Sequence, residues 1–499
     1  MTLDAQTPDT ETPDTETPRT ETPRTARTGE LWSESALGLA ARIRSGDVSS
    51  RDVIEAHLAR IEAVNPHLNA VVRVLASEAR AAADAADAAR ANGEPLPPLH
   101  GVPFTVKENI DLAGTPTTSA VVALAEAIAS IDAPIVARMR AAGAIPIGRT
   151  NLPDLGLRVH THSSLHGLTR NPWNPNVTAG GSSGGEASSL ASGMSPIGLG
   201  NDIGGSLRNP AHCCGIASIK PSTGVVPSAT VIPPLESPIS FQLMAVDGVM
   251  ARHVADVRAG LEAIAGVDSR DPVSLPVRLS DIPVDRPLRI AVLADPPGGN
   301  PTDSAIAGLV RHCGDILSDL GHDVTDTEPP SYARSIDLWR ELLGGDLRAQ
   351  RALLDMVMGD DGRRFMDLTD TAFGDIDLTA WTVVHANRNG VAKEWGQFFT
   401  EYDAIISPVW TQPAFAHGAD IVDVDGANAT LDLLRPVLQA NLLGLPAAVV
   451  PAGIANSMPV GVQIIGDRFH DLACLSIAAL IENAVGVLTP IDPVLDERR

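Results

Sequence analysis

Apolar positions along the chain follow a helical period in some stretches and form short continuous runs in others. In residues 50–65 they share one helical face, which predicts a helix that Ser50 caps and Pro66 ends. The positions that form this face are Val53, Ile54, Leu58, Ile61 and Val64. The alanine-rich residues 76–92 predict a second helix, and the prolines after it predict a break before residue 101.

Helices and strands alternate in much of the rest of the chain. The predicted strands are short apolar runs at 144–147, 288–293, 447–450 and 460–465. The predicted helices cover 134–142, a segment that Thr302 caps and Gly321 ends, and 472–485. Alternation of this kind predicts an α/β fold with a mixed, mostly parallel central sheet that helices cover on both faces.

The sequence predicts one large domain preceded by a short tail. Residues 9–23 repeat a polar five-residue unit that ends in Thr-Glu-Thr-Pro, and such a segment buries too little apolar surface to fold. We therefore expect residues 1–30 to be disordered. No linker divides residues 31–499, so we expect them to form a single domain.

The charge and cysteine content of the chain limit the binding partners and the cellular compartment that we expect. Acidic residues outnumber basic ones by 61 to 37, and the net charge of −24 disfavours binding to nucleic acid or to anionic membranes. No apolar run is long enough to span a bilayer, and the polar N-terminus argues against a secretory signal. The four cysteines have no zinc or redox spacing, and adjacent Cys213 and Cys214 are interpreted as small buried residues. We expect a cytoplasmic protein.

One lysine has the sequence context of a general base. The chain has only three lysines, Lys107, Lys220 and Lys393, among 37 basic residues. Lys107 ends the apolar run Gly101-Val-Pro-Phe-Thr-Val-Lys107. Arginine keeps its proton at working pH, whereas a desolvated lysine can lose it. Lys107 is therefore a candidate base rather than a surface charge.

Residues 178–206 are rich in glycine and serine, which fits more than one function. A flexible linker is disfavoured because apolar or helix-like sequence flanks the segment on both sides. Nucleotide-binding motifs fail, since Ile203 stands where a dinucleotide fingerprint needs its third glycine and no P-loop ending occurs. The run Gly180-Gly-Ser-Ser-Gly184 fits the nucleophile elbow of α/β-hydrolases, although the turn-rich residues 171–176 before it are a poor strand.

The same segment ends in the turn Ile203-Gly-Gly-Ser206. Consecutive glycines allow the backbone N–H groups of a turn to converge on one point. Such a turn can form an oxyanion hole, where each preorganised donor is worth about 3–4 kcal/mol. A serine beside it becomes a nucleophile only if a neighbouring base takes its proton.

Lys107, the double-glycine segment around Ser182 and the turn that ends in Ser206 together resemble the amidase signature family, whose members use a Ser–Ser–Lys triad. Further runs that resemble the family are 144–153, 171–173, 215–221, 441–446 and 459–463. The resemblance implies the amidase signature fold, with a core at 101–225, a variable substrate region at 226–430 and a C-terminal return at 431–499. The chain departs from the family at Asn201, where members more often carry a hydroxyl residue, and at Glu186, where many carry serine.

The resemblance also implies the roles of the triad. Ser206 would be the nucleophile, Ser182 would relay its proton, and Lys107, kept neutral by burial, would be the base. A cis peptide bond is implied between Gly181 and Ser182, and glycine at 180 and 181 would tolerate it. This chemistry needs neither a metal nor an organic cofactor.

Several neighbours of the triad are expected to support it. Backbone N–H groups of the turn would hold the oxyanion, and these belong to Ile203, Gly204, Gly205 and Ser206. Asp202 and Arg208 are expected to brace the loop as an ion pair, and Lys220 is expected to be a structural donor. Gly156 matches a position that lines the acyl pocket in some family members.

The sequence therefore predicts an amide hydrolase that acts on a small-molecule carboxamide or on a related hydrazide, anilide or ester. The alternative is the amidase subunit of a tRNA-dependent amidotransferase, because the family contains such subunits. An inactive scaffold is disfavoured because all three triad residues are present. We expect residues 226–430 to build the substrate pocket, and an aromatic content of 3% suggests aliphatic walls. For the assembly we hypothesise a homodimer.

Overall fold

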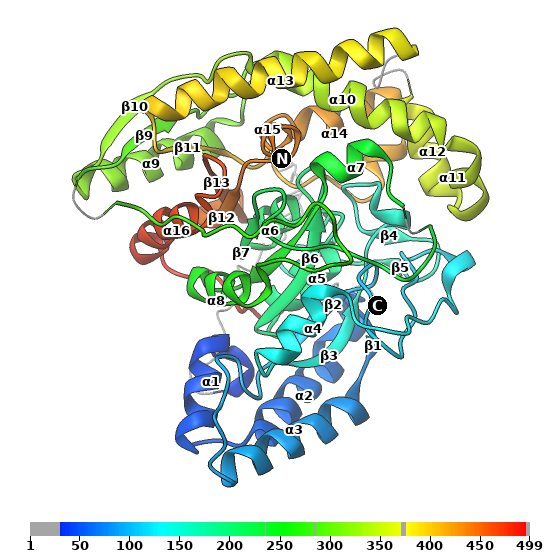
Figure 1. Ribbon diagram of the computed structural model, residues 1–499, viewed down its shortest axis with the longest axis vertical. Helices are drawn as coiled ribbons and strands as arrows, with labels where there is room; N and C mark the ends of the chain where they lie inside the picture. The colour runs from blue at the N-terminus through cyan, green and yellow to red at the C-terminus, as the bar shows by residue number, and fades with distance from the viewer. Residues whose placement is uncertain (1–29, 235, 284–285, 371–375, 496–499) are drawn as a thin grey trace, which may run out of the picture.

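An eleven-stranded sheet forms the centre of the protein in the computed structural model (Figure 1). The structure describes residues 30–234, 236–283, 286–370 and 376–495. The predicted tail at residues 1–30 lies outside these residues except for Glu30. The single large α/β domain with a mixed sheet is confirmed.

The strands come from all parts of the described chain. Their order across the sheet is β1 (Val71–Val74), β3 (Ile145–Thr150), β2 (Pro103–Lys107), β6 (Ile197–Asp202), β8 (Val246–Ala251), β7 (Ala217–Lys220), β12 (Ala447–Ala455), β13 (Met458–Gly466), β11 (Ala404–Pro408), β9 (Arg289–Val292) and β10 (Asp323–Asp326). A separate small hairpin pairs β4 (His162–Ser163) with β5 (Gly167–Leu168).

Parallel pairing occurs in two groups of strands. The strands β3, β2 and β6 form one group, and β11, β9 and β10 form the other. The strand pairs between the two groups are antiparallel, and so is the edge pair of β1 with β3. Short connections cause part of this pattern, because β12 and β13 are joined by the two-residue turn Asn456-Ser457, which forces them to run in opposite directions.

Helices cover both faces of the sheet, as expected. One face packs on α1 (Ala36–Ser45), α4 (Pro134–Ala141), α8 (Val254–Ile264), α9 (Ser304–Asp319) and α16 (Asp471–Val485). The other face packs on α5 (Gly184–Ala191), α6 (Arg208–Cys214), α7 (Ile239–Met244), α10 (Tyr332–Ala349), α11 (Arg351–Val357), α12 (Asp360–Thr369), α13 (Leu378–Glu401), α14 (Val424–Leu433) and α15 (Leu438–Leu443). Short 3₁₀ turns lie at η1 (Leu31–Ser33), η2 (Val122–Leu124), η3 (Asp154–Gly156) and η4 (Ala419–Ile421).

Strand side chains alternate between the two resulting cores. In β12, Ala448 and Val450 belong to the first core, whereas Ala447 and Val449 belong to the second. Successive side chains of a strand point to opposite faces of the sheet, and both faces are buried. The strands are therefore continuous apolar runs in the sequence.

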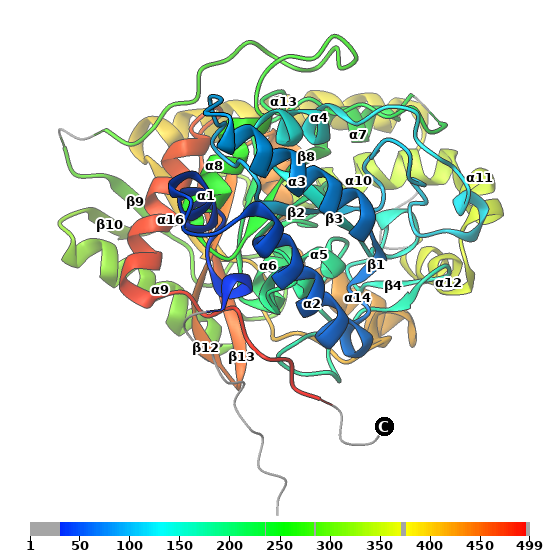
Figure 2. The same ribbon diagram turned by 90° about the horizontal axis from the view of Figure 1, so that it is seen from below.

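Two helices at the β1 end of the sheet test the predicted helix boundaries. Helices α2 (Ser50–Leu68) and α3 (Ala76–Ala91) pack together beside β1 and β3 (Figure 2). The predicted N-cap Ser50 is wrong, because Ser49 caps α2 through a capping box with Asp52. The predicted stop at Pro66 is also wrong. Pro66 is exposed, so the missing hydrogen bond falls on the solvent side while the helix continues to bury Leu68.

The predicted cap of α9 is wrong by one residue. The Asp303 carboxylate, not Thr302, accepts the N–H groups of Ala305 and Ile306, because a carboxylate is a stronger acceptor at the positive end of a helix. Cys213 and Cys214 are buried in α6, as expected. Among the described residues, none of the helices combines the length and apolar character that crossing a bilayer requires.

Candidate active site

The predicted triad residues lie near the carboxyl ends of two central strands. Lys107 is the last residue of β2 and Asp202 is the last residue of β6, and these strands are parallel neighbours. The carboxyl ends of parallel strands meet at one edge of a sheet, where α/β proteins form their sites. Ser182 lies in the loop before α5, and Ser206 lies in the turn between β6 and α6.

Lys107 and Ser182 are in direct contact. The Lys107 Nζ donates to Ser182 Oγ over 2.7 Å, and the lysine side chain is fully buried. The same Nζ donates to the Oδ1 of Asn201 over 2.6 Å. The lysine nitrogen is therefore held between a hydroxyl and an amide oxygen, with its position fixed from two sides.

The environment of Lys107 favours the neutral amine. Burial lowers the pKa of the Lys107 ammonium from its ordinary value of 10.5 to about 7, although the negative charges of Asp202, Asp247 and Glu186 oppose this change. A lysine with a pKa near neutrality can accept a proton at working pH. The neutral form of Lys107 is therefore accessible near neutral pH.

The Ser182 loop approaches its neighbours closely. The peptide bond between Gly181 and Ser182 is cis, as the resemblance implied. A Cβ at Gly181 would lie 2.6 Å from the carbonyl carbon of Val159, so this position has no room for a side chain. The Gly180 φ of +80° also suits glycine. Gly181 therefore supports the loop as expected.

The loop before Ser182 does not fit the nucleophile elbow of α/β-hydrolases. That motif needs a strand immediately before the serine, whereas residues 171–183 form turns and irregular backbone. The loop instead contacts the segment that carries Ser206. The Ser183 N–H donates to the Ser206 carbonyl over 3.3 Å. The contact brings the Ser182 loop against the turn that carries Ser206.

Hydrogen bonds from Asn209 engage two carbonyl groups of the turn before Ser206. The side chain of Asn209 donates to the Gly204 carbonyl over 3.1 Å, and its backbone N–H donates to the Gly205 carbonyl over 2.6 Å. The N–H groups of Ile203, Gly204 and Ser206 have no partner within the part of the chain that the structure describes. These three N–H groups therefore remain available as hydrogen-bond donors.

Gly205 differs from the expectation for the turn. Its N–H donates to the Oδ1 of Asp202 over 2.8 Å and is therefore already engaged. The Asp202 carboxylate also accepts the Leu207 N–H over 3.1 Å, so it binds the backbone N–H groups of both residues. Gly205 shapes the turn through its φ of +93°, a conformation that glycine adopts without strain.

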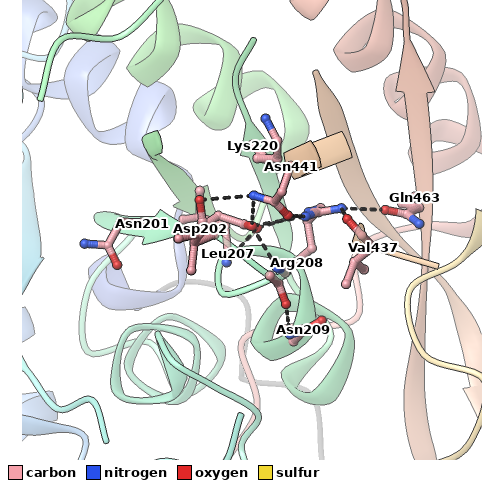
Figure 3. A network of polar contacts seen from close by, with 12 residues as sticks. Asn201, Asp202, Leu207, Arg208, Asn209, Lys220, Val437, Asn441 and Gln463 are labelled. Atoms are coloured by element: carbon pink, nitrogen blue, oxygen red, sulfur yellow. Dashed lines mark hydrogen bonds and ion pairs between the residues drawn. The ribbon is translucent and has the colours of Figure 1, made fainter. Parts of the chain in front are cut away.

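The predicted ion pair of Asp202 and Arg208 is confirmed. Two guanidinium nitrogens of Arg208 each donate to one carboxylate oxygen of Asp202 over 3.0 Å, and both side chains are fully buried. Arg208 also donates to the Oδ1 of Asn441, the Oε1 of Gln463 and the Val437 carbonyl (Figure 3). The pair therefore ties the turn to α15 and β13, since these partners come from that part of the chain.

The charge on Asp202 is stabilised by its partners. Burial alone would raise the pKa of the Asp202 carboxyl, but the positive charge and hydrogen bonds of Arg208 outweigh it and lower the pKa to about 2. Lys220 also lowers this pKa, although burial lowers the pKa of Lys220 itself to about 7. Its Nζ donates to the Pro221 carbonyl over 2.6 Å, so Lys220 is a structural donor as expected.

Glu186 is a buried carboxyl group whose surroundings the sequence did not reveal. It accepts hydrogen bonds from the hydroxyls of Thr105 and Thr150 on β2 and β3. Burial raises the pKa of Glu186 to about 7, against the lowering effect of these hydrogen bonds and of Lys107. Two features of the sequence could have indicated these contacts. Glu186 lies in the helix after Ser182, and Thr105 lies two residues before Lys107.

An apolar pocket adjoins Ser206. Ile203, Gly204 and Gly156 line it beside the serine, and the role of Gly156 in an acyl pocket stays a prediction. A Cβ at Gly156 would lie 3.2 Å from Ser182 Oγ, so glycine leaves the hydroxyl uncrowded. The other lining residues are Leu157, Arg158, Val159, Trp339, Leu343, Leu347, Phe365, Met366, Leu431 and Leu434. Most of these side chains are aliphatic, and half come from the predicted variable region.

The chain is similar to known amidases over most of its length. The family model named Amidase matches residues 52–475. The chain belongs to the amidase signature family. Indoleacetamide hydrolase from Bradyrhizobium diazoefficiens is 41% identical over 462 residues, which cover 92% of this amidase and 88% of the relative.

More distant relatives include components of larger enzymes. One subunit of glutamyl-tRNA(Gln) amidotransferase from Synechococcus sp. (strain WH7803) is 31% identical, and the match covers 90% of this amidase and 96% of the relative. The solved structure of 6-aminohexanoate cyclic dimer hydrolase complexed with substrate has a TM-score of 0.79 and 28% identity, with 92% and 98% of the two chains covered. The amidase is an amide-hydrolysing enzyme.

Proposed function

We propose that this amidase hydrolyses a small primary amide with an apolar, aromatic acyl group through an acyl-enzyme on Ser206. The observation that carries the proposal is the 2.7 Å contact between Lys107 Nζ and Ser182 Oγ. It supplies a buried base with a pKa of about 7 and a hydroxyl through which a proton can pass. The free N–H groups of the neighbouring turn supply the oxyanion hole.

The proposed reaction begins when Ser206 Oγ attacks the amide carbonyl. Its proton passes to Ser182, whose own proton passes to neutral Lys107. The N–H groups of Ile203, Gly204 and Ser206 hold the oxyanion of the tetrahedral intermediate. The C–N bond then breaks as a proton returns from Lys107 through Ser182 to the nitrogen, and ammonia leaves. Water attacks the ester by the same proton path and releases the acid.

The pocket supports an apolar acyl group. Its walls are mainly aliphatic, with Trp339 and Phe365 as aromatic members, and Ser206 lies at its edge. Such walls gain free energy by removing apolar ligand surface from water, and aromatic rings pack well against them. The name of the 41% identical relative, indoleacetamide hydrolase, points to the same class of substrate. Indole-3-acetamide and phenylacetamide are therefore the first substrates to assay.

Replacement of the nucleophile tests the proposal. Ser206→Ala should lower kcat for indole-3-acetamide by at least about 10⁴-fold, as loss of a catalytic serine does elsewhere. Ser318→Ala is the matched control, because Ser318 is exposed on α9 and its loss should leave kcat unchanged. A Ser206→Ala variant with turnover close to that of the unmodified enzyme would exclude Ser206 as the nucleophile.

A second candidate function is the amidase component of an amidotransferase. The observation that favours it is the 31% identity to a glutamyl-tRNA(Gln) amidotransferase component over nearly the whole of both chains. Purified chain without any partner separates the two functions. Turnover of simple amides by this chain alone supports the hydrolase, whereas turnover only after addition of partner proteins supports the amidotransferase.

A further inference from the structure

Trp339 joins the wall of the apolar pocket to the turn that carries the free N–H groups. It lies on α10, within the stretch where the sequence offered the least guidance, and only 4% of its surface is exposed. Its Nε1 donates to the carbonyl of Ile203 over 2.8 Å. The peptide of that carbonyl continues into the N–H of Gly204, so the indole fixes the orientation of a candidate oxyanion donor.

The indole ring also presses on the next residue of the turn. A Cβ at Gly204 would lie 2.7 Å from Cζ2 and 3.2 Å from Cη2 of Trp339. The ring therefore occupies the space above the Gly204 backbone and leaves no room for the turn to move toward α10. The same ring lines the pocket beside Leu343 and Leu347.

Two other carbonyl groups of the turn are held from within its own segment. Asn209, three residues after Ser206, holds the carbonyls of Gly204 and Gly205. Trp339 is different because its hydrogen bond comes from a distant part of the chain that also forms the pocket wall.

We infer that Trp339 is a positioning residue for the oxyanion turn, and that it makes the acyl pocket and the oxyanion hole one rigid unit. This inference rests on the proposed function, because it assigns the turn to the oxyanion. Loss of the indole N–H frees the Ile203 peptide to rotate, which weakens the stabilisation of the tetrahedral intermediate more than the binding of the planar amide. The effect therefore falls on kcat rather than on KM.

The decisive variant is Trp339→Phe, which keeps an aromatic wall but removes the N–H. It should lower kcat for phenylacetamide about tenfold to a hundredfold, with KM changed by less than about threefold. Trp395→Phe is the matched control, because the Trp395 Nε1 donates to the Pro330 carbonyl over 2.9 Å in the same core, away from the turn. Its kcat should stay within about twofold of the original.

Reaction with a fluorophosphonate provides a readout that needs no amide substrate, since its phosphoryl oxygen would occupy the same hole. The labelling rate of Trp339→Phe should fall by a similar factor to kcat. If the unmodified enzyme labels but hydrolyses no amide, the proposed substrate class fails while the ratio of labelling rates still tests Trp339. A labelling rate and kcat of Trp339→Phe within twofold of the original would overturn the inference.

A paired substitution separates positioning from a general loss of structure. Gly204→Ala should reduce labelling strongly, because the new methyl group meets the indole ring. Trp339→Phe removes the atoms that it meets, so the double variant should label faster than Gly204→Ala alone. A double variant that labels no faster than Gly204→Ala would show that the ring does not confine the turn.

Discussion

At the scale of single residues, the proposed reaction depends on the protonation of Lys107. Its burial and its two hydrogen bonds, to Ser182 and Asn201, place a nitrogen with a pKa of about 7 beside the Ser182 hydroxyl. Three carboxyl groups nearby keep that pKa from falling further. The balance between desolvation and the nearby negative charges therefore sets the pH above which Lys107 is mainly neutral and can accept a proton.

The first prediction concerns the pH dependence of kcat/KM. Only neutral Lys107 can accept the proton, so activity should rise as pH increases through about 7 and then level off. A pH profile with phenylacetamide or indole-3-acetamide measures this directly. A profile that is flat between pH 5 and pH 9 would contradict a lysine base with this pKa.

Lysine substitutions supply the controls for that profile. Lys107→Arg should abolish activity at every pH, because an arginine keeps its proton. Lys393→Arg, at an exposed position on α13, should retain both the rate and the shape of the profile.

At the scale of elements, the ion pair of Asp202 and Arg208 holds β6, α6, α15 and β13 around the active-site turn. Arg208→Met should lower the free energy of unfolding by about 3–5 kcal/mol, because it leaves the Asp202 carboxylate buried without its partner. Chemical denaturation measures the loss.

The matched control for that pair is a salt bridge at the surface. Glu262→Ala removes an exposed partner of Arg258 and should change the free energy of unfolding by less than about 1 kcal/mol. A loss of less than 1 kcal/mol for Arg208→Met as well would mean that the buried pair is not the brace described above.

Glycines in two helices give a further contrast in stability. Gly185→Ala in α5 should destabilise the fold by about 1–3 kcal/mol, because the new methyl group meets the backbone of Asn151. Gly390→Ala in α13 faces open space and should stabilise by about 0.5–1 kcal/mol. Thermal unfolding of the two variants measures both changes, and a destabilised Gly390→Ala would contradict the helix described here.

Much of the site could be predicted because its residues lie in short segments that can be recognised in the sequence. Lys107 ends an apolar run, and the turn before Ser206 has consecutive glycines, so both could be recognised without coordinates. The engagement of the Gly205 N–H was not predictable, since it depends on the rotamer of Asp202. Neither was the place of Trp339, because nothing in the sequence relates α10 to the turn some 130 residues earlier.

Part of the fold could also be predicted from the sequence. Apolar runs at 447–450 and 460–465 predicted β12 and β13, because both faces of the sheet are buried. The caps of α2 and α9 were each misplaced by one residue, since neighbouring Ser49 and Asp303 compete for the same role. Strand order could not be predicted, because pairing depends on contacts between segments that are distant in the sequence.

At the scale of the whole molecule, the net charge predicts weak binding to RNA. With a net charge of −24, the chain should repel tRNA, so we expect no binding tighter than about 10⁻⁴ M at physiological salt. Electrophoretic mobility shift or fluorescence anisotropy with labelled tRNA measures this, with a basic RNA-binding protein as the positive control. Micromolar binding by the chain alone would instead favour the amidotransferase function.

The proposed site combines segments that are distant in the chain. Strands β2 and β6 carry the lysine and the turn, while α10 and α12 from a distant stretch close the apolar pocket over Ser206. The proposed reaction uses a single serine, Ser206, to carry the covalent intermediate.

The most direct test of this claim is to label the protein with a fluorophosphonate and to locate the adduct by mass spectrometry. The account predicts one adduct per chain, on the peptide that contains Ser206, formed faster as pH rises through about 7 and not formed in Ser206→Ala. An adduct on Ser182 in the unmodified enzyme, or equal labelling of the Ser206→Ala variant, would contradict it.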